Sequence, residues 1–83
     1  MASRQTIQAR VESVIMQRFG RVETDLVEQG IVDSLGAMEL LVLLQKEFEV
    51  RLGDVMIADL ATVPRIAAVV EAALAAEASP AAS

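Results

Sequence analysis

The stretch of sequence that decides the fold runs from residue 33 to residue 48 and reads Asp33-Ser34-Leu35-Gly36-Ala37-Met38-Glu39-Leu40-Leu41-Val42-Leu43-Leu44-Gln45-Lys46-Glu47-Phe48. Strong helix formers fill most of this stretch, and the Asp-Ser pair at its start consists of residues that are preferred at a helix N-cap. We therefore predict a helix over residues 33–48.

This helix carries two apolar stripes. The first has the spacing of a buried face and consists of Leu40, Leu44 and Phe48, with Leu41 beside them. The second lies at i, i+3, i+7 on another side of the helix and consists of Leu35, Met38 and Val42. A chain of this size buries both stripes only if the fold wraps around the helix. Otherwise the second stripe is exposed and marks a surface for a partner.

The N-terminal segment has the periodicity of another helix. Its apolar side chains share one helical face and are Ile7, Val11, Val14, Ile15 and Phe19. This pattern predicts a helix over about residues 4–18, with Ser3 or Thr6 as its N-cap and Gly20 as the residue that ends it.

The connection between these two helices is long for a small helical protein, and loops of that length usually are functional or carry a short element. Asp25 and Glu28 have the spacing of a capped single turn, which Gly30 closes. Leu26 and Ile31 are expected to pin this turn to the core.

Two further helices are expected after residue 53. Asp54 is a suitable N-cap for a short third helix, whose apolar residues are Val55, Met56, Ile57 and Leu60. Thr62 is a suitable cap for a fourth helix that ends near residue 76 and tolerates Pro64 in its first turn. Its inward-facing residues are predicted to be Ile66, Val69 or Val70, and Leu74.

These elements predict one all-α domain over residues 1–76, followed by a flexible tail over residues 77–83. We expect a four-helix bundle of three longer helices and a short third one, with a long loop between the first two. The sequence shows no alternation typical of strands and no internal repeat.

The composition argues against an enzyme that works alone. The 83 residues include neither cysteine nor histidine, so the chain lacks thiol chemistry and the commonest general base and metal ligand. Carboxylates such as Asp54 and Asp59 are scattered and form no recognisable acid–base or metal arrangement. The longest apolar runs are five residues, far below the roughly 20 that span a bilayer. Without a span or a secretory pattern, we expect a free-standing cytoplasmic protein.

The net charge of −5 argues against DNA or RNA as the partner. Residues 1–21 contribute +3 and the remainder contributes −8. This segregation predicts a dipolar protein that presents its acidic part to positively charged partner surfaces. The alternative is that these charges only keep the domain soluble.

Ser34 has two interpretations on local spacing. Asp33 or Ser34 acting as the helix cap explains the pair completely. A serine nucleophile that activates itself would need a nearby base, and Lys46, three turns further along, is a poor candidate. An exposed hydroxyl at the positive end of a helix does favour a phosphate ester, which suits a serine that another enzyme modifies.

The chain resembles the acyl carrier protein family. The resemblance rests on the run 26–35 (Leu-Val-Glu-Gln-Gly-Ile-Val-Asp-Ser-Leu), on Glu39-Leu40-Leu41 and Glu47-Phe48, and on the later Thr62-Val63. It implies a four-helix bundle that carries 4′-phosphopantetheine on the serine of an Asp-Ser-Leu motif. Here that motif is Asp33, Ser34 and Leu35, with Ser34 as the attachment site.

The resemblance also implies a mode of action. A phosphopantetheinyl transferase would move the arm from coenzyme A to Ser34, and an acyl- or aminoacyl-activating ligase would load its thiol. A downstream transferase or synthase would then use the substrate, while the carrier itself, expected as a monomer, performs no catalysis. The partner-facing positions implied by the family are Leu35, Met38, Glu39 and Val42. Packing of this stripe against the long loop and the third helix is the alternative.

Two residues depart from the common fatty-acid carriers, which have acids at the positions of Gly36 and Lys46. The chain therefore resembles more closely the D-alanyl and other aminoacyl carriers, or stand-alone carriers of specialised pathways. Gly36 is expected to reduce crowding near the arm for a closely approaching partner.

Long acyl chains in this family can slip between the second and third helices. The candidate lining residues here are Leu44, Met56, Ile57 and Leu60, and the sequence does not separate such a pocket from a filled core.

A second hypothesis is a small helical adaptor that never carries a cofactor. It would grip a partner helix with the stripe of Leu35, Met38 and Val42.

Overall fold

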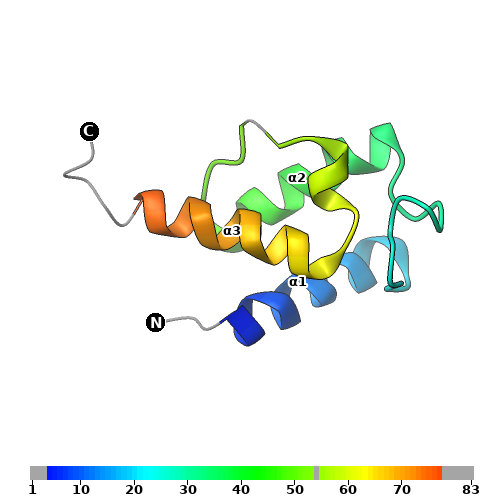
Figure 1. Ribbon diagram of the computed structural model, residues 1–83, viewed down its shortest axis with the longest axis horizontal. Helices are drawn as coiled ribbons and strands as arrows, with labels where there is room; N and C mark the ends of the chain where they lie inside the picture. Colours follow the sequence, from blue (N-terminus) through cyan, green and yellow to red (C-terminus); the bar gives the residue numbers. More distant parts are fainter. Residues whose placement is uncertain (1–3, 54, 78–83) are drawn as a thin grey trace.

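The computed structural model describes residues 4–53 and 55–77 of the chain, and this part is helical throughout, without a strand. Its elements are α1 (Arg4–Phe19), α2 (Ser34–Phe48), the 3₁₀ helix η1 (Ile57–Leu60) and α3 (Val63–Glu77). Figure 1 shows the three long helices gathered around one core, with the loop 20–33 at one end. The predicted all-α bundle of three longer helices and one short one is confirmed.

The predicted core stripes are buried. The fully or almost fully buried apolar side chains of the long helices include Ile7, Val11, Ile15, Leu40, Leu44, Ile66 and Val70. Phe48 is also buried, while Phe19, Leu41, Val69 and Leu74 are partly buried against this core. The most extensive helix–helix contact joins α1 to α3. Within the described ranges, no helix is both long and apolar enough to cross a membrane.

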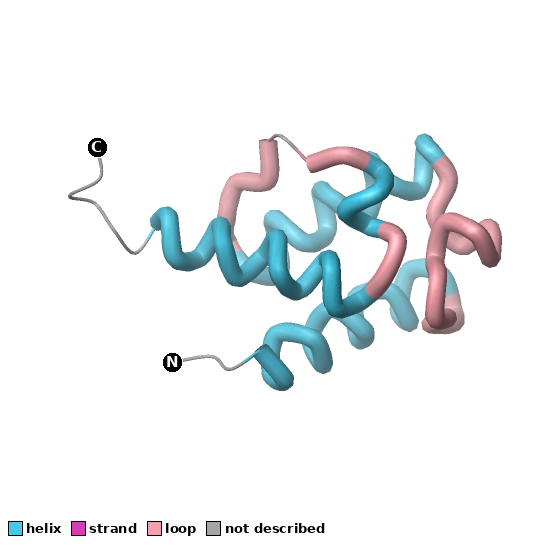
Figure 2. Tube along the Cα trace, viewed as in Figure 1, coloured by secondary structure: helices cyan, strands magenta, loops and turns pink. Residues whose placement is uncertain are grey.

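The long loop is an ordered part of the fold. Asp25 Oδ1 accepts hydrogen bonds from the backbone N–H groups of Val27 (3.1 Å) and Glu28 (2.9 Å), which confirms the predicted capped turn. Leu26 is fully buried, and its N–H donates to the carbonyl oxygen of Ala61 at 2.6 Å. Gly30 closes the turn with a positive φ of 74°. The loop therefore delivers the chain to the start of α2 from a fixed position, as the pink segment in Figure 2 shows.

The third predicted helix differs from the expectation. It is a single 3₁₀ turn that begins only at Ile57, and the N–H of Met56 donates to Asp59 Oδ2 at 3.1 Å. The expected cap, Asp54, lies outside the described residues. A segment this short between two turns is typical of a 3₁₀ connector.

The observed ends of α1 and α3 differ only slightly from those predicted from the sequence. Thr62 Oγ1 accepts from the N–H of Arg65 at 3.2 Å and caps α3 as predicted. α3 extends to Glu77, and residues 78–83 of the expected tail lie outside the described part. Because α1 already includes Arg4, Thr6 lies inside the helix and is not its N-cap. The other candidate cap, Ser3, lies outside the described residues.

Two core residues after α2 were missed. α2 ends with Glu49 in the left-handed conformation at φ 54°, and this turn directs Val50 and Leu52 into the core, where both are buried. The N–H of Leu52 donates to Gln45 Oε1 at 3.0 Å. An apolar contact next to a left-handed helix end is a recurrent capping feature.

Candidate functional site

The cap of α2 is Asp33 and not Ser34. Asp33 has extended backbone angles, and its Oδ1 accepts from the N–H of Gly36 at 2.7 Å. Ser34 is the first residue of α2, and its side chain is exposed. Its hydroxyl makes no hydrogen bond to any described residue, so it stands free at the positive end of the helix.

Gly36 is buried beneath this cap. A Cβ atom at this position would lie 3.1 Å from Asp33 Oδ1 and 3.4 Å from Cε1 of Phe19. A side chain here would point inward, against the capping carboxylate and the end of α1. The expectation that Gly36 relieves crowding for an approaching partner is therefore wrong, because Gly36 instead makes room for the cap.

A double-mutant cycle tests this coupling. Asp33→Ala is expected to cost about 0.5–2 kcal/mol of stability, since it removes the cap. Gly36→Ala alone is expected to change the free energy of unfolding little, because the clash of the new Cβ with the Asp33 carboxylate offsets a helix-propensity gain of about 1 kcal/mol. In the Asp33→Ala background the same change should recover most of that gain. Urea unfolding of the four chains measures the coupling.

Asp33→Asn is the matched control for the cap, because Asn keeps an acceptor oxygen and is expected to lose only a few tenths of a kcal/mol. If Gly36→Ala changed the free energy of unfolding equally in the native and the Asp33→Ala backgrounds, the glycine would be unrelated to the cap.

The second apolar stripe of α2 is exposed. Leu35, Met38 and Val42 are 67%, 66% and 48% exposed, so the fold does not wrap around this face. An open groove of about 390 Å³ runs beside it and is lined by Arg18, Leu35, Met38, Glu39, Val42 and Leu43. The four positions predicted to face a partner thus line one surface, which begins one residue after Ser34.

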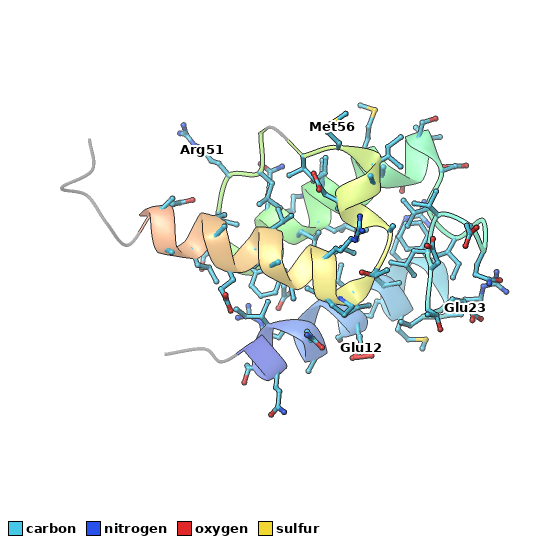
Figure 3. The ribbon with its side chains drawn as sticks, in the orientation of Figure 1. Glu12, Glu23, Arg51 and Met56 are labelled. Atoms are coloured by element: carbon cyan, nitrogen blue, oxygen red, sulfur yellow. The ribbon has the colours of Figure 1, made fainter. Side chains whose placement is uncertain are left out.

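Sequence reasoning missed further apolar surface beside α2. Met56 and Ile57 are 72% and 42% exposed, and η1 contacts α2. Figure 3 shows Met56 projecting outward just before η1. These two residues were expected to line an acyl-chain pocket together with Leu44 and Leu60, which are fully buried. That lining is corrected, because only two of its four members face the interior.

Arg10 and Arg18 of α1 lie against two acids of α2, Glu47 and Glu39. Arg18 Nε donates to Glu39 Oε2 at 2.6 Å, and the two side chains form an ion pair. Arg10 Nε donates to Glu47 Oε2 at 3.1 Å, and Arg10 Nη2 donates to the carbonyl oxygen of Glu47 at 2.7 Å. These pairs bring basic residues of the N-terminal segment next to acidic residues of α2, so the folded domain is less dipolar than the sequence predicts. Local sequence spacing gives no signal for the pairing of Arg18 with Glu39, one of the positions expected to face a partner.

The fold and the site define a class of protein: a small helical bundle with a free serine at the start of an exposed amphipathic helix. A family model described as "Phosphopantetheine attachment site" matches residues 5–70. The chain belongs to this family, which is that of the acyl carrier proteins. No curated protein and no solved structure gives a significant match.

The family attaches 4′-phosphopantetheine as its prosthetic group, and its members interact with transferases and synthases. The residues at the start of α2 fit this group. An exposed hydroxyl that stabilises no helix end is free to be esterified, and the positive end of α2 favours the phosphate. When bound, the group supplies the thiol that this cysteine-free chain lacks.

Proposed function

We propose that the protein is a carrier that bears 4′-phosphopantetheine on Ser34 and holds its substrate on that arm as a thioester for presentation to partner enzymes. The observation that supports it most directly is the division of roles at the start of α2. Asp33 caps the helix, which leaves the Ser34 hydroxyl exposed and without a partner among the described residues.

Attachment at Ser34 is a phosphoryl transfer. Ser34 Oγ attacks the phosphorus of coenzyme A that bears the pantetheine chain, a new O–P bond forms, and the pyrophosphate P–O bond breaks. Adenosine 3′,5′-bisphosphate leaves, and the Oγ proton passes to a base. That base belongs to the transferase, because Lys46 lies three turns along α2 and the chain has no histidine.

The residues around Ser34 orient and present the arm. Asp33 fixes the first turn of α2, and the hydrogen-bonded loop fixes the position of that turn on the core. Leu35, Met38, Glu39 and Val42 form the surface that partners contact next to the arm. A tethered substrate reaches each docked enzyme at high effective concentration.

The partners in this proposal are a phosphopantetheinyl transferase, an acyl- or aminoacyl-activating ligase, and a downstream transferase or synthase. The carrier acts as a monomer in the cytoplasm and performs no catalysis itself. An aminoacyl or specialised-pathway cargo is favoured over a general fatty-acid role by Lys46, which replaces an acid on α2.

The test is the mass of the chain after incubation with coenzyme A, magnesium and a broad-specificity phosphopantetheinyl transferase. We expect one phosphopantetheine per chain, located by tandem mass spectrometry on Ser34 within the tryptic peptide 22–46. An unmodified chain, with a control carrier modified in the same tube, would favour the adaptor that uses the α2 stripe without a cofactor.

A further inference from the structure

The end of α1 and the start of α2 meet at Gly36. A Cβ atom placed on Gly36 would lie 3.4 Å from Cε1 of Phe19, the last residue of α1, and 3.7 Å from the carbonyl oxygen of Ile31 in the loop. Because Gly36 has no side chain, the Phe19 ring lies directly against the backbone of the first turn of α2. This turn carries Ser34.

The Phe19 ring has a defined position at this junction. It is partly buried against the core, and the Arg18 guanidinium lies over its face with Cζ at 5.3 Å from the ring centroid. This distance is within the range of a cation–π contact. Arg18 also donates to Glu39 of α2 at 2.6 Å. The last turn of α1 is therefore fastened to α2 at two points, Phe19 against Gly36 and Arg18 beside Glu39.

The first turn of α2 depends on contacts from outside the helix. The first N–H groups of a helix have no carbonyl partner within it, so this turn opens more readily than the middle of the helix. The Asp33 carboxylate satisfies one of these groups, the N–H of Gly36. A rigid first turn therefore needs packing against the core in addition to the cap, and the Phe19 ring supplies that packing at Gly36.

Modification of Ser34 needs a fixed orientation of its hydroxyl group. Ser34 Oγ has to approach the phosphorus of coenzyme A in line with the P–O bond that breaks. A misplacement of about 1 Å can lower the rate of such a step by as much as about 100-fold. The hydroxyl makes no hydrogen bond to the described residues, so its direction follows the backbone of the first turn.

We propose that Phe19 is a positioning residue for Ser34. Its ring supports the first turn of α2 and so keeps the Ser34 hydroxyl in the orientation in which a transferase modifies it. Phe19 acts through the backbone at Gly36 and not by contact with the arm. The inference rests on the proposed function, because it concerns the reaction at Ser34.

Phe19→Leu tests this support, because leucine keeps an apolar side chain at the end of α1 but lacks the ring carbon next to Gly36. Steady-state kinetics use the chain without the arm as the varied substrate of a broad-specificity phosphopantetheinyl transferase, with coenzyme A at saturation. We expect kcat to fall about tenfold. KM is expected to change by less than about twofold, since the exposed stripe of α2 stays the same. Phe19→Tyr, which retains the ring, is expected to recover most of the native kcat.

Hydrogen exchange of the Gly36 N–H gives a second measurement that needs no transferase. This N–H donates to Asp33 Oδ1 and exchanges with solvent when the first turn opens. Nuclear magnetic resonance of the ¹⁵N-labelled chains is expected to show about tenfold faster exchange at Gly36 in Phe19→Leu than in the native chain.

Leu74→Ala is the matched control for a loss of packing elsewhere. Leu74, like Phe19, is partly buried against the core. It belongs to the C-terminal half of α3, which Figure 1 shows at the end of the molecule away from the loop 20–33. This variant should lose stability without a change in kcat or in the exchange rate of Gly36.

Four kinetic results would overturn the positioning role: a native kcat in Phe19→Leu, a rise of KM alone, a Phe19→Tyr chain as slow as Phe19→Leu, or an equal loss of kcat in Leu74→Ala. Native exchange of Gly36 in Phe19→Leu would overturn it as well. If no chain gains phosphopantetheine, the native one included, the proposed function fails. The exchange of Gly36 then still tests the support of the first turn by Phe19.

Discussion

The Ser34→Ala chain is expected to gain no mass from coenzyme A and a phosphopantetheinyl transferase, whereas the native chain gains one phosphopantetheine. Alanine removes the only atom at the start of α2 that can form the phosphate ester, while the backbone of the first turn stays in place. Intact-mass spectrometry of both chains, incubated side by side, measures the difference as all or none.

The same substitution is expected to leave the free energy of unfolding within about 0.5 kcal/mol of the native value. The Ser34 hydroxyl makes no hydrogen bond to the described residues, and the cap bond runs from Gly36 N–H to Asp33. Alanine is also the better helix former. Thus a failure to be modified cannot be traced to unfolding.

Two outcomes would contradict this assignment. A mass gain on the Ser34→Ala chain would place the arm on another hydroxyl, of which Thr24 lies nearest in the sequence. A stability loss of the size expected for Asp33→Ala would show that Ser34 contributes to the cap after all.

The long helices were predictable because their apolar residues repeat with the helical period. Leu40 and Leu44 on α2 and Ile7 and Val11 on α1 are buried as that period requires. Val32, which follows the turn of the loop, is also buried but has no periodic neighbours to indicate it. Burial of a loop residue depends on the path of the chain, which periodicity does not describe.

The site was predictable in its motif and not in its geometry. The Asp-Ser-Leu motif singled out Ser34, but two residues of similar capping propensity stood side by side, and only the structure assigns the cap to Asp33. Likewise, the pair of Arg18 and Glu39 joins residues 21 apart in sequence. Arginines of the basic N-terminal segment pair with acids of α2 in the fold. Net charges summed over sequence segments therefore overstate the dipole of the folded domain.

Leu44→Ala is expected to be the most destabilising of the substitutions considered, with a loss of about 2–5 kcal/mol. Leu44 is fully buried in the middle of α2, and its removal deletes contacts on the core side of the helix. A domain of this length has a stability of about 4–12 kcal/mol in total. Leu44→Ala therefore removes a large fraction of it.

Val42→Ala is the matched control, because it lies on the same helix two residues earlier with 48% of its surface exposed, and a loss near 0.5 kcal/mol is expected there. Urea unfolding followed by circular dichroism compares the urea midpoints of the two chains. The dependence of the unfolding free energy on urea concentration should be the same for both. If Leu44→Ala cost no more than Val42→Ala, the interior between α2 and η1 would already be loosely packed around Leu44. That space would then be able to admit a cargo chain, whereas a full loss at Leu44 means that the core is filled and that a cargo must displace side chains to enter it.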